Sequence, residues 1–553
     1  MTAVASAGSS SAAFRALAGE ILNEYLAFSP VTATTLGDHR FDDRLEDRSP
    51  DGVRAELVAL RVRLAALNAL DVSELDVADR VDRDTLAGRL AARAFDLSEL
   101  REHEWNPMHA NPGNALHLLL ARDYAPLPDR LRALRGRLAA VPAALAQSRA
   151  TLGDLPEVHL ETAIEQFAGT RTLLATEVER ALRKAGSAQD ELEPVLDVTT
   201  TAIEKHLAWL TERRDEATGD PRLGPELFAR QLGLTLDTAS TPDEVLVRAE
   251  AELVRIEEEI AEVAVRLDGG APRAGQVREV LDRLAEERPD NETIVALAAA
   301  TLAETREFVL AHELITVHDD PVEIVVMPEI HRGVAVAYCQ PSGPLETAPL
   351  PTFYAISPTP AGWPPERVES FFREYNVHMI RNLTIHEAMP GHVLQFAHAR
   401  RFAATTPVRA AFWSGPFVEG WAVYAEELMV EHGFGGDAVR MQQLKMQLRM
   451  TINAILDVRV HTRDMTYEEA MRLMVERGHQ EEGEAVGKWR RALLTSTQLS
   501  TYFVGYTEVA EVADRLAAEH PGWSTRQRHD TLLAHGSPPP RHLAPLLGLQ
   551  PPG

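Results

Sequence analysis

The sequence predicts a mainly α protein with a small β-sheet in its second half. Apolar residues recur three and four positions apart through most of the 553 residues, which is the period of an amphipathic helix. Strand-like runs rich in β-branched and aromatic residues occur only after residue 315. Because a chain of this length exceeds one simple core, we expect two or more packed regions.

Helices account for most of the first half of the chain. Thr241 suits the N-cap of one long helix, with Pro242 at its first position and Glu244 completing a capping box. The glycine-rich break after this helix predicts a boundary between an N-terminal helical region, residues 1–270, and a second region, residues 271–553. The other helices predicted before the break cover residues 14–26, 51–67, 79–100, 128–151, 158–185 and 195–216.

The second region is predicted to contain the sheet, between about residues 320 and 358. Its three short strands, at residues 322–327, 334–339 and 352–357, are separated by turns that contain Pro or Gly. Helices are predicted on both sides of the sheet. They cover residues 274–288 and 291–312 before it, the segment around residue 386, and residues 417–430, 438–461 and 467–477 after it.

The composition argues against several classes of protein. The net charge is −27, from 56 Lys and Arg against 83 Asp and Glu, which argues against nucleic acid or an anionic membrane as a partner. Cys339 is the single cysteine, so neither an intrachain disulfide nor a cysteine-based metal site is possible. The N-terminus lacks a signal-peptide pattern, and no apolar run reaches membrane-spanning length. We therefore expect a cytoplasmic protein.

The most informative segment is His386-Glu387-Ala388-Met389-Pro390-Gly391-His392, which offers two imidazoles and a carboxylate. A step of six residues turns an ideal helix by about 600°, which leaves the two histidines about 120° apart. Pro390 removes an amide donor, and Gly391 tolerates unusual backbone angles. The sequence therefore predicts a helix deformed between Ala388 and His392, so that both histidines reach one metal ion.

A second segment has the same offsets and shows that this motif alone is weak evidence. Residues 103–109 place His103, Glu104 and His109 at the same spacing, but Met108 stands where the first motif has Gly391. No comparable acid-bearing helix follows it. We assign this copy to chance or to a structural role.

An acidic residue downstream separates the two copies. Glu419 lies 27 residues after His392 and begins an apolar helical face. A buried carboxylate needs a cation or hydrogen bonds, and two histidines with a distant acid are the usual ligands of catalytic zinc. Glu426 lies on the same face, either as a rival ligand or as a hydrogen-bond partner of a ligand.

Four blocks of the chain resemble the signature blocks of the DUF885 family, which is grouped by similarity with the gluzincin metallopeptidases. The matching blocks lie within roughly residues 330–510, and the chain departs from the family pattern at Val393, Met465, Ser496 and Thr497, none of which is a proposed ligand. The blocks themselves are residues 386–395, 419–422, 457–461 with 466–470, and 498–505.

The resemblance implies a large helical gluzincin-like architecture in which His386, His392 and Glu419 hold Zn²⁺. It also implies that Glu387 is the general base. Three protein ligands leave a position for a water molecule, which zinc activates and Glu387 deprotonates.

Two further groups are candidates for stabilising the oxyanion of the reaction. These are Tyr502 and His461, and Asp457 lies four residues before His461, where its carboxylate could fix the tautomer of the imidazole. The alternative for Tyr502 is a core tyrosine, and for the Asp457–His461 pair a surface pair of no catalytic weight.

Three secondary expectations concern the surroundings of the site. The strand at residues 352–357 is expected to offer an edge on which an extended peptide can pair. His398 is expected on a helix surface. The basic run at residues 488–491 is expected to be a solvated helix face, or alternatively a binding site for a peptide carboxylate.

The sequence thus predicts a zinc-dependent hydrolase, a peptidase that cleaves short peptides in a helical cleft walled by the N-terminal region. One alternative keeps the zinc but cleaves non-peptide amides or esters. Another is a catalytically inactive helical binding or scaffold protein, against which the intact Glu387 argues because a structural metal site needs no base. The oligomeric state stays open.

Overall fold

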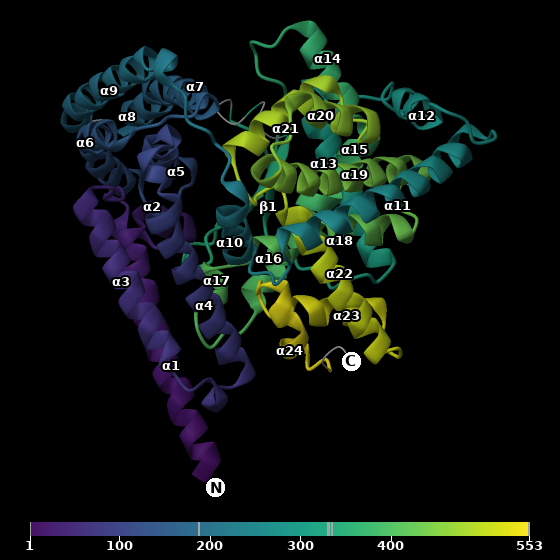
Figure 1. Cartoon of the computed structure of the whole chain (residues 1–553), viewed down its shortest axis with the longest axis horizontal. Coiled ribbons are helices and arrows are strands. Elements are labelled where there is room, and N and C mark those ends of the chain that lie inside the picture. The colour runs from purple at the N-terminus through teal and green to yellow at the C-terminus, as the bar shows by residue number, and fades with distance from the viewer. Residues whose placement is uncertain (1, 186–188, 329–331, 333–335, 551–553) are drawn as a thin grey trace. The chain divides into compact units, whose positions relative to one another are not determined.

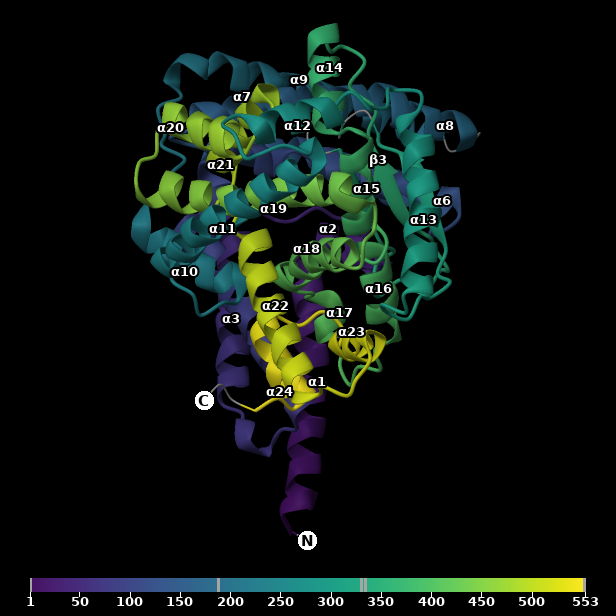
Figure 2. The same ribbon diagram turned by 90° about the vertical axis from the view of Figure 1, so that its right-hand side faces the viewer.

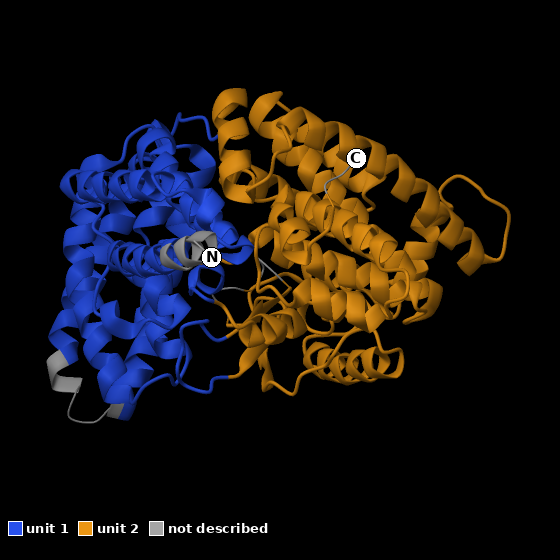
Figure 3. Ribbon diagram, turned by 90° about the horizontal axis from the view of Figure 1, so that it is seen from below, with its two compact units in different colours: residues 1–221, 342–350, 405–411 blue, residues 222–341, 351–404, 412–553 orange. Residues whose placement is uncertain are grey.

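The computed structural model of the protein describes residues 2–185, 189–328, 332 and 336–550 (Figure 1). Most of these residues are helical, so the predicted mainly α fold is confirmed. The chain divides into two compact units (Figure 3). Unit 1 contains residues 1–221, 342–350 and 405–411, and unit 2 contains residues 222–341, 351–404 and 412–553.

This division lies earlier than the predicted boundary at residue 270. The reason is helix α11 (Pro242–Asp268), which packs along α19 (Gly436–Thr462) and so belongs to unit 2. The capping box predicted at its start is present, since Thr241 Oγ1 accepts from the Glu244 amide and Glu244 reaches back to the Thr241 amide. Gly269 ends the helix in the left-handed conformation with φ 69°.

Part of unit 1 is built around an apolar core, to which α6, α7 and α9 contribute many leucines. Its two late segments return from the second half of the chain. Its main helices are α1 (Thr2–Phe28), α2 (Pro30–Leu36), α3 (Pro50–Asn68), α4 (Val77–Phe95), α5 (Gly113–Ala121), α6 (Leu127–Thr151), α7 (Glu157–Leu173), α8 (Glu179–Ala185), α9 (Gln189–Glu212) and α17 (Val408–Ala411).

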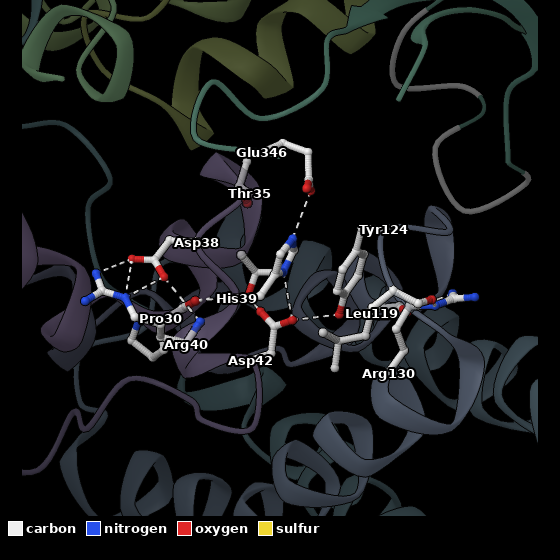
Figure 4. A network of polar contacts seen from close by, with 12 residues as sticks. Pro30, Thr35, Asp38, His39, Arg40, Asp42, Leu119, Tyr124, Arg130 and Glu346 are labelled. Atoms are coloured by element: carbon white, nitrogen blue, oxygen red, sulfur yellow. Dashed lines mark hydrogen bonds and ion pairs between the residues drawn. The ribbon is translucent and has the colours of Figure 1, made fainter. Parts of the chain in front are cut away.

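The returning segment 342–350 is fastened to unit 1 by a polar network around His39 (Figure 4). His39 Nε2 lies 2.9 Å from Glu346 Oε2, and its Nδ1 lies 2.9 Å from Asp42 Oδ2. The imidazole stacks on Tyr124, whose hydroxyl donates to the same Asp42 oxygen at 2.6 Å. Burial lowers the pKa of His39, but the two carboxylates outweigh it and the net direction is upward.

The second returning segment, residues 405–411, is held by a buried carboxylate. Asp82 accepts from the Thr406 hydroxyl at 2.6 Å and from Arg409 Nε at 2.5 Å. Both charged side chains are almost fully buried, so each satisfies the other where water cannot reach.

Unit 2 is organised around α19, which is buried on nearly every face. It packs against α11, α15, α18 and α22 (Figures 1 and 2). The helices of unit 2 are α10 (Gly224–Leu236), α11 and α19 as above, α12 (Gln276–Leu284), α13 (Ile294–Ala311), α14 (Pro365–Glu374), α15 (Val377–Glu387), α16 (His392–Arg401), α18 (Gly415–Glu431), α20 (Tyr467–Arg472), α21 (Glu482–Leu494), α22 (Thr501–Glu519), α23 (Thr525–Leu533) and α24 (Leu543–Leu547).

The predicted sheet is present, with strands β1 (Val322–Val326), β2 (Ala337–Gln340) and β3 (Thr352–Ile356) in the order β1-β3-β2. β3 pairs in parallel with β1 and antiparallel with β2, with Cys339 opposite Tyr354. The expectation that residues 352–357 offer an edge to a peptide is therefore wrong, because β3 is the central strand. Part of the predicted second strand, residues 334 and 335, lies outside the described residues.

No helix in the described part of the chain combines the length and apolar character needed to cross a membrane.

Candidate metal centre

The predicted deformation between the two motif histidines is present. α15 ends at Glu387 and α16 begins at His392, with the Met389–Pro390 peptide bond cis between them. The Gly391 amide donates to the Ile385 carbonyl at 2.9 Å, which folds the linking residues back onto the end of α15. A Cβ atom on Gly391 would lie 1.8 Å from the His386 carbonyl oxygen, so only glycine fits this close approach.

Trp421 fixes the linking turn from the neighbouring helix α18. Its indole Nε1 donates to the Pro390 carbonyl at 3.0 Å, and its side chain is fully buried. The contact means that α18 positions both the acidic residue of the site and the turn that separates the two histidines.

The turn brings His386 and His392 close to one another and to Glu419. One ligand atom from each of the three residues can be chosen so that all three lie within 4.8 Å of one another. Glu419 Oε2 lies 3.4 Å from Nε2 of His386 and 3.5 Å from Nε2 of His392. The two imidazoles meet nearly edge to face, with ring centroids 4.8 Å apart. These three residues form the one group of possible metal ligands found in the described part of the chain.

The donor set fits zinc. Two imidazole nitrogens and one carboxylate oxygen are ligands that Zn²⁺ takes in catalytic sites. Glu419 Oε2 is buried and forms no hydrogen bond with any described residue, so its contacts with the imidazoles lack hydrogen-bond geometry. A buried carboxylate oxygen that faces two imidazole nitrogens without bonding either is what a cation between them would satisfy.

The charges within this group are strongly coupled. Burial by itself raises the pKa of Glu419, but the two imidazoles outweigh burial and hold the pKa of this carboxyl far below its usual range. Burial lowers the pKa of His386, and the carboxylates of Glu419 and Glu426 more than reverse that effect.

Glu426 holds His386 from the far side and is not a member of the three-residue group. His386 Nδ1 donates to Glu426 Oε1 at 2.7 Å, and Asn382 Nδ2 donates to Glu426 Oε2 at 2.5 Å. A carboxylate on Nδ1 fixes the tautomer of the imidazole and leaves Nε2 free to bind a metal. Of the two roles left open by the sequence, this contact favours that of a hydrogen-bond partner of His386.

Glu387 lies at the end of α15 against strand β2. One of its oxygens, Oε2, accepts from the Cys339 amide at 2.9 Å, and burial raises the pKa of this carboxyl. Among the described residues, this backbone amide is the one hydrogen-bond partner of the Glu387 carboxylate, and it orients the side chain through Oε2.

Tyr502, on α22, is the second predicted catalytic residue that the fold brings to the group. Its ring centroid lies 6.4 Å from that of His386. The negative charge of Glu419, followed by burial, raises the pKa of Tyr502, so the phenol stays protonated and can donate.

Asp457 and His461 have other partners. The Asp457 carboxylate accepts from the Thr497 amide at 3.0 Å and from the Ser500 amide and hydroxyl at 2.9 and 2.7 Å. His461 Nε2 lies 3.1 and 3.0 Å from the carbonyls of Ala492 and Thr495. The predicted hydrogen bond between Asp457 and His461 is not formed, because backbone groups just before α22 bind Asp457 and backbone groups at the end of α21 bind His461.

No hydrogen bond or ion pair among the described residues joins Asp457 or His461 to the three-residue group. Both instead hold the connection between α21 and α22, and α22 carries Tyr502. Their role in the fold is to position this helix.

Two expected surface groups are buried. His398 is 9% exposed, and its Nε2 donates to the Thr316 carbonyl at 2.8 Å. Lys488 is also 9% exposed, so the basic run is not a solvated face at this residue.

Sequence reasoning did not identify Asn382 or the Cys339 amide as parts of the site. Asn382 precedes His386 by four residues and therefore shares its helix face, which is a signal that the sequence contained. The sequence contains no signal for the Cys339 amide, because the position of a backbone donor depends only on where the strand lies in the fold.

Fold and site together define a mainly helical protein with a buried group of two histidines and a glutamate arranged as metal ligands. The chain belongs to the DUF885 family, described as bacterial proteins of unknown function, whose profile matches residues 30–547. The family resemblance predicted from the motif blocks is confirmed. No curated protein matches the chain.

Two solved structures have the same fold over nearly the whole chain. One is described as "a putative lipoprotein of unknown function" from Shewanella oneidensis, with 26% identity and a TM-score of 0.82, and covers 97% of this chain and 99% of its own. The other is described as a "putative lipoprotein" from Colwellia psychrerythraea, with 16% identity and a TM-score of 0.81 over 98% of each chain. Neither description assigns an activity.

Proposed function

We propose that this protein is a zinc-dependent hydrolase that cleaves peptide bonds of short peptides. The observation that carries the proposal is the convergence of His386, His392 and Glu419, whose ligand atoms all lie within 4.8 Å of one another, next to Glu387. A purely structural zinc site would be closed by a fourth side chain, whereas three ligands leave a position for water.

The chemistry divides among the residues of the site. Zinc held by Nε2 of His386, Nε2 of His392 and the Glu419 carboxylate would lower the pKa of a water molecule and polarise the substrate carbonyl. Glu387 accepts the proton of the attacking water and returns it to the leaving amine. The protonated Tyr502 hydroxyl donates to the oxygen on which negative charge develops.

The supporting contacts keep these groups aligned. Glu426 holds the Nδ1 proton of His386, and the Cys339 amide holds one oxygen of Glu387. Both contacts reduce the reorganisation that the reaction requires. The same residues could also hydrolyse non-peptide amides or esters. The experiment below determines which of these bonds is cleaved.

Metal analysis followed by turnover tests the proposal. Protein purified with zinc should contain about one Zn²⁺ per chain and should cleave members of a library of short peptides. Glu387→Gln should keep its zinc and lose activity by about a thousandfold or more. Cleavage of esters or simple amides but not peptides would identify the alternative hydrolase.

Protein that binds no zinc would overturn the metal assignment. If zinc-loaded wild type and zinc-loaded Glu387→Gln are equally inactive on peptides, amides and esters, the result would favour the alternative of an inactive helical binding protein. The cytoplasmic location and the absence of nucleic-acid and membrane partners stay predictions, which fractionation of producing cells and binding assays would test.

A further inference from the structure

A buried basic group lies on α21, in the run that the sequence expected to be solvated. Lys488 is 9% exposed, although an ammonium is among the groups least often buried. Arg491 follows it by three residues, so both side chains extend from the same face of the helix.

The acidic residues around this group already have cationic partners. Glu374 is buried between Lys445 Nζ, at 2.8 Å, and Arg449 Nη2, at 2.5 Å. Arg449 also lies 3.7 Å from Glu484. These two anions and two cations balance, so they supply no net charge for a third or fourth cation.

The positive charges of Lys488 and Arg491 are therefore not balanced by these acidic residues. Lys488 forms no hydrogen bond or ion pair with any residue that the structure describes. Arg491 donates its Nε to the neutral Gln498 Oε1 at 3.0 Å. Burial, only partly offset by Glu484, lowers the pKa of Lys488 to about 7. A buried ammonium without a partner is costly, and such a residue is a candidate for binding a ligand.

The group is linked to the candidate metal centre through the start of α22. Gln498, which accepts from Arg491 Nε at 3.0 Å, precedes Tyr502 by four residues. The Tyr502 ring is in turn 6.4 Å from the ring of His386. Two residues of an extended peptide span about 7 Å, so even a short peptide bound at the metal would extend beyond the Tyr502 ring.

We propose that Lys488 and Arg491 bind a carboxylate of the substrate, so that the enzyme selects short peptides with a negative charge one or two residues beyond the scissile bond. The inference rests on the proposed hydrolase function and names its substrate class. The carboxylate is either the C-terminus of the peptide or an acidic side chain, since lysine and arginine bind both in the same way.

Binding of zinc-directed hydroxamates tests the inference without requiring turnover. Three dipeptide hydroxamates are compared on zinc-loaded protein: one with a free C-terminal carboxylate, one with a C-terminal amide, and one with the amide and a glutamate as its last residue. Wild type should bind at least one carboxylate form about 10- to 100-fold more tightly than the neutral amide. The form that is favoured identifies the source of the carboxylate.

Lys488→Met and Arg491→Gln should each reduce this preference to less than about threefold, while the neutral amide binds as it does to wild type. Arg463→Gln is the matched control, because it removes an exposed arginine paired with Asp243 elsewhere in unit 2. Equal binding of all three compounds to zinc-loaded wild type would overturn the inference alone. Failure to bind zinc and every hydroxamate would instead refute the proposed function.

Stability and proton uptake distinguish a binding role from a structural one. Lys488→Met should unfold at the same or a higher urea concentration than wild type, because it removes a buried charge that no protein group satisfies. At pH 8, calorimetry in two buffers should show that wild type takes up more protons than Lys488→Met on binding the favoured carboxylate form, by up to about one proton, because the hydroxamate loses its own proton on zinc in both proteins. A large loss of stability, or the same proton balance in wild type and Lys488→Met, would remove Lys488 from the binding site.

Discussion

The chain contains the same motif twice, and the two copies fold differently. At residues 386–392 the histidines are brought to a common point with Glu419. At residues 103–109 they are not: His109 Nε2 contacts Glu102 at 2.6 Å, whereas His103 lies 3.6 Å from Glu104. The spacing of two histidines is therefore, by itself, a poor predictor of a metal site.

What separates the copies is backbone packing and a distant acid. In the first copy Gly391 lets the chain approach the His386 carbonyl more closely than a side chain allows. In the second, Asn106 caps a short turn by accepting from the Met108 amide at 3.1 Å, and the histidines follow that turn. Only the first copy packs against a helix that supplies both a carboxylate, Glu419, and an indole that holds the turn.

Gly391→Ala should give the largest effect. The added Cβ would meet two backbone oxygens, which cannot move aside as a flexible side chain can. We expect a loss of about 3 kcal/mol in the free energy of unfolding and complete loss of zinc binding, measured by urea unfolding and metal analysis. Gly88→Ala is the control, because nothing lies within 4 Å of its added Cβ in α4. It should gain about 0.5–1 kcal/mol.

Equal effects of the two substitutions would show that the close approach at Gly391 is not required.

His392→Ala and His109→Ala compare the two copies directly. Loss of one of three protein ligands should weaken zinc binding by about a thousandfold, about 4 kcal/mol. His109, with 51% of its side chain exposed, should be replaceable without change in zinc content. Competition with a chromogenic chelator measures both affinities, and a comparable loss in His109→Ala would mean that the second copy also binds metal.

Glu426→Gln should have a smaller effect on the same affinity. The variant keeps a hydrogen-bond acceptor for His386 Nδ1 but removes the charge, so zinc affinity should fall by about 10- to 100-fold with the stoichiometry retained. Loss of all zinc would contradict the assignment, because it would make Glu426 a ligand in place of Glu419.

Much of this comparison could be predicted from the sequence, where the signal is local. The capping box at Thr241, the helical periods and the three strands depend on neighbouring residues, and these predictions are confirmed. Glu419 was found because an acid opening an apolar helical face is conspicuous. The need for a deformed helix followed from helix geometry and from the Pro390-Gly391 pair.

The rest depends on contacts between residues far apart in the chain. The central place of β3 follows from pairing with strands on both sides, which no single strand sequence encodes. The burial of Lys488 and the partners of Asp457 depend on how α19, α21 and α22 pack. Helix α22 was not predicted, so Tyr502 could be proposed only from the family resemblance.

Two buried histidines, one from each unit, differ in the direction of their pKa shifts, and the contrast is electrostatic. In unit 1, His206 is fully buried, and its Nε2 has no hydrogen-bond partner among the described residues. Burial, followed by the charge of Arg149, lowers the pKa of His206 to about 4. In unit 2, His386 is also buried but has carboxylates at both nitrogens, and the direction of its pKa shift is reversed. Burial alone keeps a histidine neutral, and burial with carboxylates keeps it charged or bound to a cation.

Acidification should reveal the neutral histidine in unit 1. The unfolded chain binds a proton at His206 near pH 6.5, whereas the folded chain binds it only near pH 4, so stability falls as the pH drops between these values. Between pH 7 and pH 5, protonation of His206 in the unfolded chain should lower the free energy of unfolding by about 2 kcal/mol. In His206→Gln the difference between urea unfolding at the two pH values should be smaller by that amount, because glutamine does not titrate. An unchanged difference would mean that His206 is protonated in the folded state, and that burial without a carboxylate does not set the charge of histidines in this chain.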